Sequence, residues 1–274
     1  MIPKIIHFCW FGKNPLPYEA IKCIESWKKF FPDYEIKEWN ETNFDCYCCD
    51  YISEAYEKGK WAFVSDYARF KILYEYGGIY FDTDVEVIKN FDDIIENGGF
   101  MGCEASSKLM NFDSAYNVAA GLGLGVEPQN AFYKEILDYY NNQHFILPNG
   151  TINPTTVVVR VTKILKEHGF VGNGDIENIE GITIYPPDYF CPLNNDTGEL
   201  LLTNNSHSIH YYSSSWYTET QKKYQAFLRN NVKKNKIHTL KNIILGLGYR
   251  IKFNIEVLGV KGVLLKLYSK FRSH

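Results

Sequence analysis

The sequence lacks the features that mark membrane-spanning, secreted and zinc-binding proteins. No apolar run reaches the ~20 residues that a membrane-spanning helix requires. The first residues, from Met1 to His7, contain neither the apolar core nor the cleavage site of a signal peptide. Of the seven cysteines, only Cys46 and Cys49 have Cys-x-x-Cys spacing, and no second pair completes a four-ligand zinc site. We therefore expect reduced thiols in a cytoplasmic protein.

Excess positive charge is missing from most of the chain. Residues 232–274 hold eight Lys and two Arg against one acid, a charge of +9, which leaves −12 for the rest of a chain with a net charge of −3. An acidic body argues against a nucleic-acid-binding protein. In the tail, lysines alternate with apolar residues at helical spacing, which predicts a basic amphipathic helix on an anionic membrane surface. The alternative is a helix that packs on the domain or on another subunit.

A dinucleotide-binding fingerprint is also absent. The run from Gly121 through Gly123 to Gly125 does not match Gly-x-Gly-x-x-Gly and does not open a helix. We expect these small residues to allow close approach of the backbone to a ligand or a neighbouring segment.

What is present is the element order of an α/β protein. Residues 2–12 predict a buried strand, residues 17–31 an amphipathic helix, and residues 34–39 a second strand that pairs in parallel with the first. The apolar face of that helix is predicted to comprise Ile21, Ile24, Trp27 and Phe31. Further helices are predicted at 53–58, 91–96, 130–140 and 154–168, a loop at 169–181, and strands at 99–104, 183–185 and 206–210. We predict an α/β domain over residues 1–231 and a helical tail over residues 232–274.

The most informative stretch covers residues 61–86. Its first part has helical apolar spacing, Gly77-Gly78 ends the helix, and a short buried strand follows. Asp82 and Asp84 come at the end of that strand, where a period of two would place both carboxylates on one side. Two carboxylates this close repel each other unless a cation or hydrogen-bond donors lie between them, and a hard divalent metal ion meets that need.

Three classes of protein are consistent with this carboxylate pair. A haloacid-dehalogenase-like phosphatase has a similar Asp-x-Asp after a strand, but Glu86 stands where Thr or Val is usual. An EF-hand loop is excluded by Glu86 and Val87, which leaves a non-catalytic metal-dependent sugar-binding module as the second class. The third class is a nucleotide-sugar glycosyltransferase.

Three further sites have both a functional and a structural interpretation. Trp10 ends the first strand, where it would stack on a nucleotide base or pack in the core. Asp66 and Arg69 share a helical face, either as a surface ion pair or as contacts to a sugar and a phosphate. His210 follows a short strand and is either a metal ligand or an ordinary edge histidine.

Taken together, these segments resemble glycosyltransferase family 32, from about residue 2 to residue 216. The resemblance is carried by Trp10 after the first strand, by Ser65-Asp66-x-x-Arg69, by Gly77-Gly78-Ile79-Tyr80-x-Asp82-x-Asp84, and by His210 followed by Ser215-Trp216. The family includes capsular-polysaccharide transferases and yeast-type mannosyltransferases, and it is similar to the glucosylating domain of large clostridial toxins. The resemblance implies a GT-A fold with a mixed sheet and a retaining transferase that uses Mn²⁺, or Mg²⁺, and a nucleoside-diphosphate sugar.

The resemblance also implies roles for individual residues. Asp84 matches the metal-binding aspartate, and His210, Tyr211 and the serines before Trp216 are the candidates for a further ligand. Asp82 matches the aspartate that binds ribose and sugar hydroxyls. Asp66 and Arg69 match contacts to the donor sugar and phosphate. The other expected donor contacts are Trp10, Ser65, Tyr80, Asn153, Ser215 and Trp216. We expect a UDP-hexose donor (glucose or galactose), a glycan or lipid-linked acceptor, and a peripheral location on the inner face of the cell membrane.

Overall fold

The computed structural model describes residues 1–105, 115–195 and 197–213, together with a few scattered positions after residue 219. Its centre is an eight-stranded mixed sheet in the order β2-β1-β3-β7-β5-β9-β8, with β6 paired to β5. The α/β class and the mixed sheet are as predicted. All seven cysteines are free thiols, which confirms another expectation. The strands of this sheet are β1 (Ile5–Cys9), β2 (Glu35–Trp39), β3 (Gly78–Tyr80), β5 (Gly99–Ala105), β6 (Tyr116–Val118), β7 (Leu124–Val126), β8 (Glu177–Ile179) and β9 (Ile182–Tyr185).

Two strands form a separate small sheet. β4 (Val85–Val87) and β10 (Ser208–His210) pair antiparallel, with Val85 opposite His210. Since β4 follows β3 after a four-residue connection, this small sheet begins where the centre of the main sheet ends. It therefore brings a late part of the chain to the end of β3.

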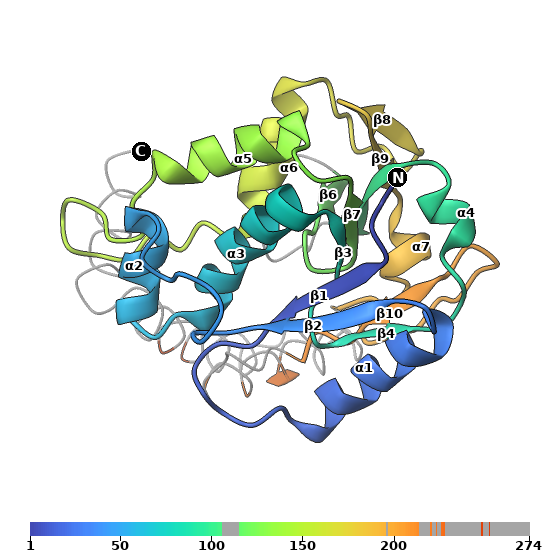
Figure 1. Ribbon diagram of the computed structural model, residues 1–274, viewed down its shortest axis with the longest axis horizontal. Helices are drawn as coiled ribbons and strands as arrows, with labels where there is room; N and C mark the ends of the chain where they lie inside the picture. Colours follow the sequence, from blue (N-terminus) through green and yellow to red (C-terminus); the bar gives the residue numbers. More distant parts are fainter. Residues whose placement is uncertain are drawn as a thin grey trace.

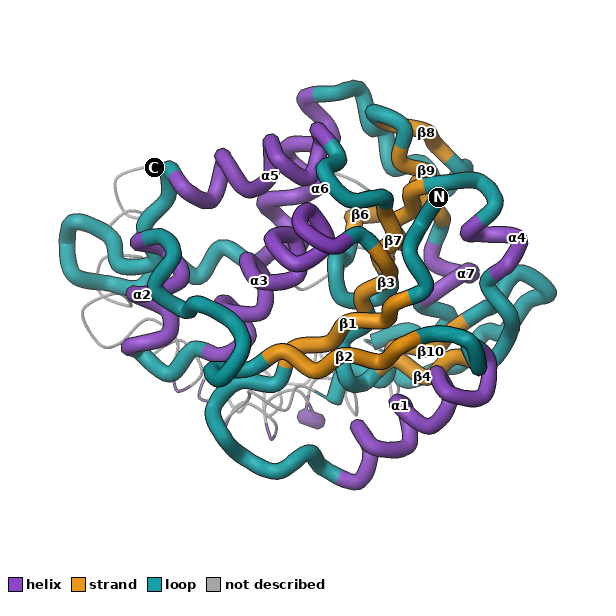
Figure 2. Tube along the Cα trace, viewed as in Figure 1, coloured by secondary structure: helices purple, strands orange, loops and turns teal. Residues whose placement is uncertain are grey.

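Helices cover both faces of the main sheet (Figures 1 and 2). The helices are α1 (Tyr18–Phe30), α2 (Asp50–Glu57), α3 (Trp61–Tyr76), α4 (Asp92–Ile95), α5 (Ala131–Asn141), α6 (Val157–Glu167) and α7 (Pro187–Phe190). One hydrophobic cluster joins α2, α3, α5 and α6 to the sheet, and a second joins α1, α4 and α7 to it. The opening β1-α1-β2 unit has the predicted parallel pairing, with Ile6 opposite Ile36.

Local chemistry explains where α3 ends. Gly77 caps the helix at φ +63°, and Gly78 follows at φ +100°, a region that side chains with a Cβ rarely adopt. A Cβ on Gly78 would also lie 2.6 Å from the carbonyl oxygen of Ile5. The Gly-Gly pair therefore lets β3 turn back beside β1, and this fixes the direction in which the chain leaves β3.

Three predictions about the elements need correction. Ile21 is 42% exposed, because α1 buries the stripe of Ala20, Cys23, Ile24 and Trp27 instead. α6 begins at Val157 rather than Pro154, since the Asn153 side chain accepts a hydrogen bond from the Thr155 N–H and keeps this segment in a turn. The expected loop over 169–181 contains β8, which is short and pairs with β9 only.

Candidate metal centre

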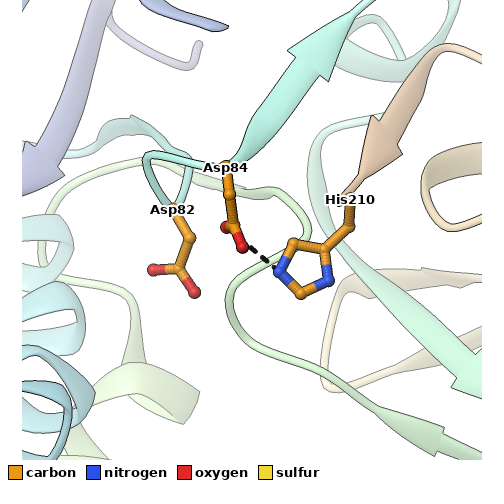
Figure 3. A group of neighbouring side chains, drawn as sticks. All are labelled: Asp82, Asp84 and His210. Atoms are coloured by element: carbon orange, nitrogen blue, oxygen red, sulfur yellow. Dashed lines mark ion pairs between the residues drawn. The ribbon is translucent and has the colours of Figure 1, made fainter. Parts of the chain in front are cut away.

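Asp82, Asp84 and His210 meet at the end of β3 (Figure 3). Each offers one ligand atom, and these atoms lie within 4.8 Å of one another. His210 Nε2 is 3.1 Å from Asp84 Oδ1. A histidine far along the sequence thus lies beside the carboxylate pair, a position that is compatible with its interpretation as a metal ligand.

The two carboxylates lie in a turn, so the prediction that a continuing strand presents them was wrong. β3 ends at Tyr80 and β4 begins at Val85, and the Val85 N–H donates to the Asp82 carbonyl, 3.1 Å away, to close the turn. Because Val85 is held opposite His210, the ladder between β4 and β10 limits how far β3 can extend. The carboxylates converge through this turn rather than through strand periodicity.

The segment after β10 holds Asp84 from both sides. The Tyr211 N–H donates to the Asp84 carbonyl at 2.9 Å, and the Ser213 N–H and Oγ donate to Asp84 Oδ2 at 2.8 and 3.0 Å. Burial alone would raise the pKa of Asp84, but the His210 charge and the two Ser213 donors hold it well below its usual range. Asp84 is therefore ionised at neutral pH, as a metal ligand must be.

Arg69 lies beneath the turn and is 3% exposed. Its Nη2 donates to Asp66 Oδ1 at 3.0 Å and lies 3.4 Å from Asp82 Oδ1, while its Nε donates to the Ser65 carbonyl at 3.0 Å. Burial opposes the charge, but the carboxylates of Asp82 and Asp66 raise the pKa of Arg69 further above its already high value. The predicted Asp66–Arg69 pair is thus buried and extends to Asp82.

Gly121 leaves the space in which Asp82 and Arg69 meet. A Cβ at this position would lie 1.9 Å from Asp82 Oδ2 and 3.3 Å from Arg69 Nη1. The Gly121 carbonyl also accepts the Asp82 N–H at 3.0 Å. The glycine run thus permits close approach, as predicted, but the sequence did not indicate which segment would approach it.

The remaining predicted donor contacts have different positions. The Tyr80 hydroxyl donates to Asp82 Oδ1 at 2.9 Å, and its ring centre is 4.9 Å from the Arg69 guanidinium carbon. Trp10 is half-buried, and its Nε1 donates to the Asn14 carbonyl. Among the described residues, no hydrogen bond or ion pair joins Trp10 or Asn153 to the carboxylates. Ser215, Trp216 and all but two residues of the tail lie outside the described residues.

Sequence reasoning did not single out Ser213 within the serine run, and it gave Tyr212 no role. Tyr212 has a positive φ of 51°, and its ring lies 4.3 Å from that of His210. Its hydroxyl donates to Glu104 at 3.1 Å. The serine-rich run signalled a loop near the site, but only the backbone turn at Tyr212 decides which serine faces Asp84.

The three clustered side chains fit a divalent metal ion in number and chemistry. Two carboxylates and one imidazole are donors that Mn²⁺ accepts, whereas Mg²⁺ prefers oxygen ligands throughout. The Asp84 charge outweighs burial and raises the pKa of His210 well above its ordinary value. Ligation requires a neutral imidazole, so metal binding here would release a proton.

Fold and site together define an α/β protein with a carboxylate–histidine centre above a buried arginine. Residues 17–100 match the family described as the glycosyltransferase sugar-binding region containing a DXD motif. The matched segment includes α1, α3 and both aspartates of the turn. Within the matched segment, Asp82-Thr83-Asp84 has the Asp-x-Asp form that the family's description names.

Two proteins of similar sequence are named as glycosyltransferases. An uncharacterized glycosyltransferase of Acanthamoeba polyphaga mimivirus is 29% identical over 232 residues, which cover 79% of this chain and 84% of that protein. The inositol phosphoceramide mannosyltransferase 3 of Schizosaccharomyces pombe is 30% identical over 118 residues, which cover 40% of this chain and 32% of that protein. The coarse class of activity supported by the family and these relatives is glycosyl transfer.

Solved structures of similar shape carry related descriptions. A galactosyltransferase in complex with donor and acceptor sugar analogues has a TM-score of 0.42 at 13% identity, with 83% of this chain and 95% of that chain covered. A glycosyltransferase involved in glycosylation of the major capsid of PBCV-1 also has a TM-score of 0.42, at 14% identity, with 77% and 95% covered.

Proposed function

We propose that this protein is a metal-dependent, retaining glycosyltransferase. It moves a hexose, glucose or galactose, from a UDP-sugar to a glycan or lipid-linked acceptor in surface polysaccharide synthesis. The observation that carries the proposal is the convergence of Asp82, Asp84 and His210 directly above the buried Arg69. It unites a metal-ligand set with a fixed positive charge, which are the two features needed to bind a diphosphate.

Each residue of the site has a distinct proposed role. Asp84 and His210 would hold Mn²⁺, or Mg²⁺, which as a Lewis acid would stabilise the negative charge that develops on the leaving diphosphate. Asp82 would accept hydrogen bonds from ribose and sugar hydroxyls. Among the described residues, the buried Nη1 of Arg69 has no hydrogen-bond partner. It lies over Gly121, from which it could donate to the donor sugar or phosphate.

The remaining donor contacts are proposed from the family resemblance. Trp10 and Tyr80 would lie beside the nucleotide, with Ser65 and Asn153 near the sugar. Ser215 and Trp216 would close over the diphosphate and keep water away from the reacting bond.

The contacts of Asp82 bear on the stereochemistry. Its Oδ1 accepts from the Tyr80 hydroxyl and lies beside Arg69, so this carboxylate is already engaged by a donor and a cation. Such a carboxylate is a poor nucleophile toward the anomeric carbon. Retention is therefore proposed to occur by attack of the acceptor on the same face from which the diphosphate leaves.

A single screen of melting temperatures distinguishes the proposed function from two alternatives, a sugar-binding module and a phosphatase. The fission yeast relative is named as a mannosyltransferase, so the donor panel is UDP-glucose, UDP-galactose and GDP-mannose, each with Mn²⁺. A donor that binds the folded protein raises its melting temperature by mass action. A sugar-binding module would respond to free hexoses instead, and a phosphatase to phosphate with Mg²⁺.

The central test is Asp84→Asn. The amide removes the negative charge of a metal ligand, so metal-dependent hydrolysis of the donor is expected to fall by at least about 100-fold, beyond the 10- to 100-fold typical of changes around a metal site. The melting temperature without metal should stay close to that of the wild type. Asp33→Asn, at an exposed carboxylate whose ion-pair partner is Lys4, is the matched control and should leave hydrolysis unchanged. Hydrolysis that persists in wild-type protein after chelation would show that the metal assignment is wrong.

A further inference from the structure

Tyr212 lies next to both members of the Asp84–His210 pair. Its ring centre is 4.3 Å from that of His210, and the two ring planes are tilted by 56°. The residue after it, Ser213, donates its N–H and its hydroxyl to Asp84 Oδ2 at 2.8 and 3.0 Å. Tyr212 therefore contacts one candidate metal ligand through its side chain and directs the backbone that holds the other.

The His210 imidazole has one nitrogen that no hydrogen bond from the described residues holds. Its Nε2 lies 3.1 Å from Asp84 Oδ1, and its other nitrogen points away from the carboxylates (Figure 3). That nitrogen, Nδ1, is buried and has no hydrogen-bond partner in the described part of the chain. A metal-binding histidine usually donates its second nitrogen to a carbonyl or a carboxylate, which fixes the plane of the ring. Here the contact that restricts the ring is its packing against Tyr212.

The far end of the Tyr212 side chain is anchored to two other parts of the fold. Its hydroxyl donates to Glu104 Oε2, at the end of β5, at 3.1 Å. The Sγ of Cys191, just after α7, lies 2.9 Å from the same hydroxyl oxygen. Because the single hydroxyl proton goes to Glu104, the thiol is the donor in this second contact. The side chain thus connects His210 to the main sheet and to α7.

The backbone of Tyr212 adopts a conformation that a tyrosine rarely takes. Its φ of +51° lies in the left-handed region, where a side chain with a Cβ is strained. Such strain persists only where surrounding contacts hold it, and it is concentrated at functional sites. This turn directs Ser213 toward Asp84 while the ring stays beside His210. The contacts of the side chain therefore stabilise the strained turn.

We propose that Tyr212 is a positioning residue for two metal ligands at once. Its anchored ring fixes the plane of the His210 imidazole, and its left-handed turn places Ser213 against Asp84. The positioning part concerns these residues alone and needs no metal ion, whereas the effect on metal affinity rests on the proposed function. The two parts are therefore measured separately.

The positioning part is measured by NMR of the His210 imidazole in metal-free protein, with its signals assigned by their loss in His210→Gln. An aromatic ring at this distance shifts the imidazole protons, so we expect sharp signals displaced from the values of free histidine. Tyr212→Asn removes the ring but keeps a residue type that tolerates positive φ. The His210 signals should then move toward the free values and broaden. Tyr212→Phe keeps the ring and should retain most of the displacement.

The metal part is measured as binding of Mn²⁺ to the full chain by EPR, which detects the free ion. Tyr212→Asn should weaken binding by about 10- to 100-fold, the range typical of residues that orient metal ligands, and Tyr212→Phe by less. In a His210→Ala background Tyr212→Asn should have little further effect, because no imidazole remains to be positioned. Tyr185→Phe is the matched control, since it removes a buried hydroxyl that accepts from Asn97 at 3.2 Å, and it should leave Mn²⁺ binding unchanged.

A further variant isolates the turn from the ring. Tyr212→Val also lacks the ring, but a β-branched residue strongly disfavours positive φ, so Ser213 should move away from Asp84. In the His210→Ala background, Tyr212→Val should therefore still weaken Mn²⁺ binding, although Tyr212→Asn does not. Equal affinities of these two double variants would contradict the role of the turn.

Three results would overturn the role of the ring. One is a set of His210 signals that does not change in Tyr212→Asn. Another is a loss of Mn²⁺ affinity in Tyr212→Asn that is the same with and without His210. If Tyr212→Asn does not fold, Tyr212→Phe decides, and Mn²⁺ binding equal to that of the wild type would be the third. If the wild type does not bind Mn²⁺, the proposed function fails, while NMR still decides whether Tyr212 positions His210.

Discussion

His7 is a buried side chain that holds β1 against the end of α3, from which β3 leads to Asp82 and Asp84. It is fully buried in β1, its Nε2 lies 2.9 Å from the Gly77 carbonyl, and its Nδ1 accepts from the Trp39 indole N–H at 3.0 Å. These contacts define the neutral tautomer, with the proton on Nε2 and the acceptor at Nδ1. A second proton on Nδ1 would face the Trp39 N–H, another donor. His7 therefore joins β1 to the end of α3 only while it is neutral.

This arrangement predicts how stability depends on pH. Burial is the main reason that the pKa of His7 falls to about 4, from about 6.5 in the unfolded chain. The unfolded state binds more protons between these values, so the contribution of His7 is complete above about pH 6.5 and is lost as the pH falls toward 4. The total loss is about 3 kcal/mol, from 1.36 kcal/mol per pKa unit.

The check is urea unfolding at pH 7.5, 6 and 5 for wild type and His7→Gln. Carboxylates titrate in both proteins, so the difference between their slopes isolates His7. His7→Gln should be less stable at pH 7.5 but lose less stability on acidification. Parallel slopes would rule out this role for His7.

At the residue scale, sequence reasoning identified the residues whose charge is unusual beside a buried strand. Asp82 and Asp84 were identifiable because two acids so close at the end of a buried strand need a counter-charge. The roles of Gly121 and Ser213 depend on their positions in space, beside Asp82 and Asp84 respectively. That position depends on pairings between distant segments, which a pattern within one segment does not encode.

At the scale of elements, α1 and β4 are joined by a tryptophan. Trp27 is fully buried, its Nε1 donates to the Val85 carbonyl at 2.8 Å, and its ring packs between Phe8 and Phe81. Val85 is the first residue after the turn that holds Asp82 and Asp84. The contact between α1 and β4 therefore supports this turn from the side opposite α3, the helix that carries Arg69.

Trp27→Phe tests this contact. It keeps an aromatic ring but leaves the Val85 carbonyl without its donor and removes part of a buried side chain, so the free energy of unfolding should fall by roughly 2 kcal/mol. Chemical denaturation measures this directly. Trp61→Phe is the control, because Trp61 is only half-buried and its Nε1 has no hydrogen bond among the described residues. An equal loss in both variants would mean that the hydrogen bond contributes little.

Element types were predicted better than element ends. The long helices and the first strands follow from apolar periodicity, which is a local property. The start of α6 is set by the Asn153 side chain, and β8 forms because it pairs with β9. Such ends depend on one side-chain hydrogen bond or on a pairing partner, so spacing alone does not reveal them.

At the scale of the whole molecule, the charge of the chain is divided unevenly. No described helix has the length and apolar character needed to cross a bilayer. We propose that residues 1–231 form the catalytic domain and that residues 232–274 attach it to the inner face of the membrane. Ten basic residues against one acid would supply the attraction to anionic lipids.

Deletion of residues 232–274 should therefore abolish binding to vesicles that contain anionic lipid while donor hydrolysis remains. Co-sedimentation with such vesicles and with neutral vesicles measures the first effect, and a hydrolysis assay the second. The full-length chain should lose its vesicle binding in high salt, since the attraction is electrostatic. Undiminished binding of the shortened chain would refute the membrane role of the tail.

The pairing of β4 with β10 has a consequence for how the protein is made. All described strands of the main sheet lie before residue 186, whereas the group of Asp82, Asp84 and His210 is completed only by His210. As the chain leaves the ribosome, the segments that build the hydrophobic clusters emerge before the strand that completes the carboxylate–histidine centre. A nascent chain can thus bury much of its core before His210 reaches Asp82 and Asp84. Under the proposed function, metal loading would then be one of the last events in its maturation.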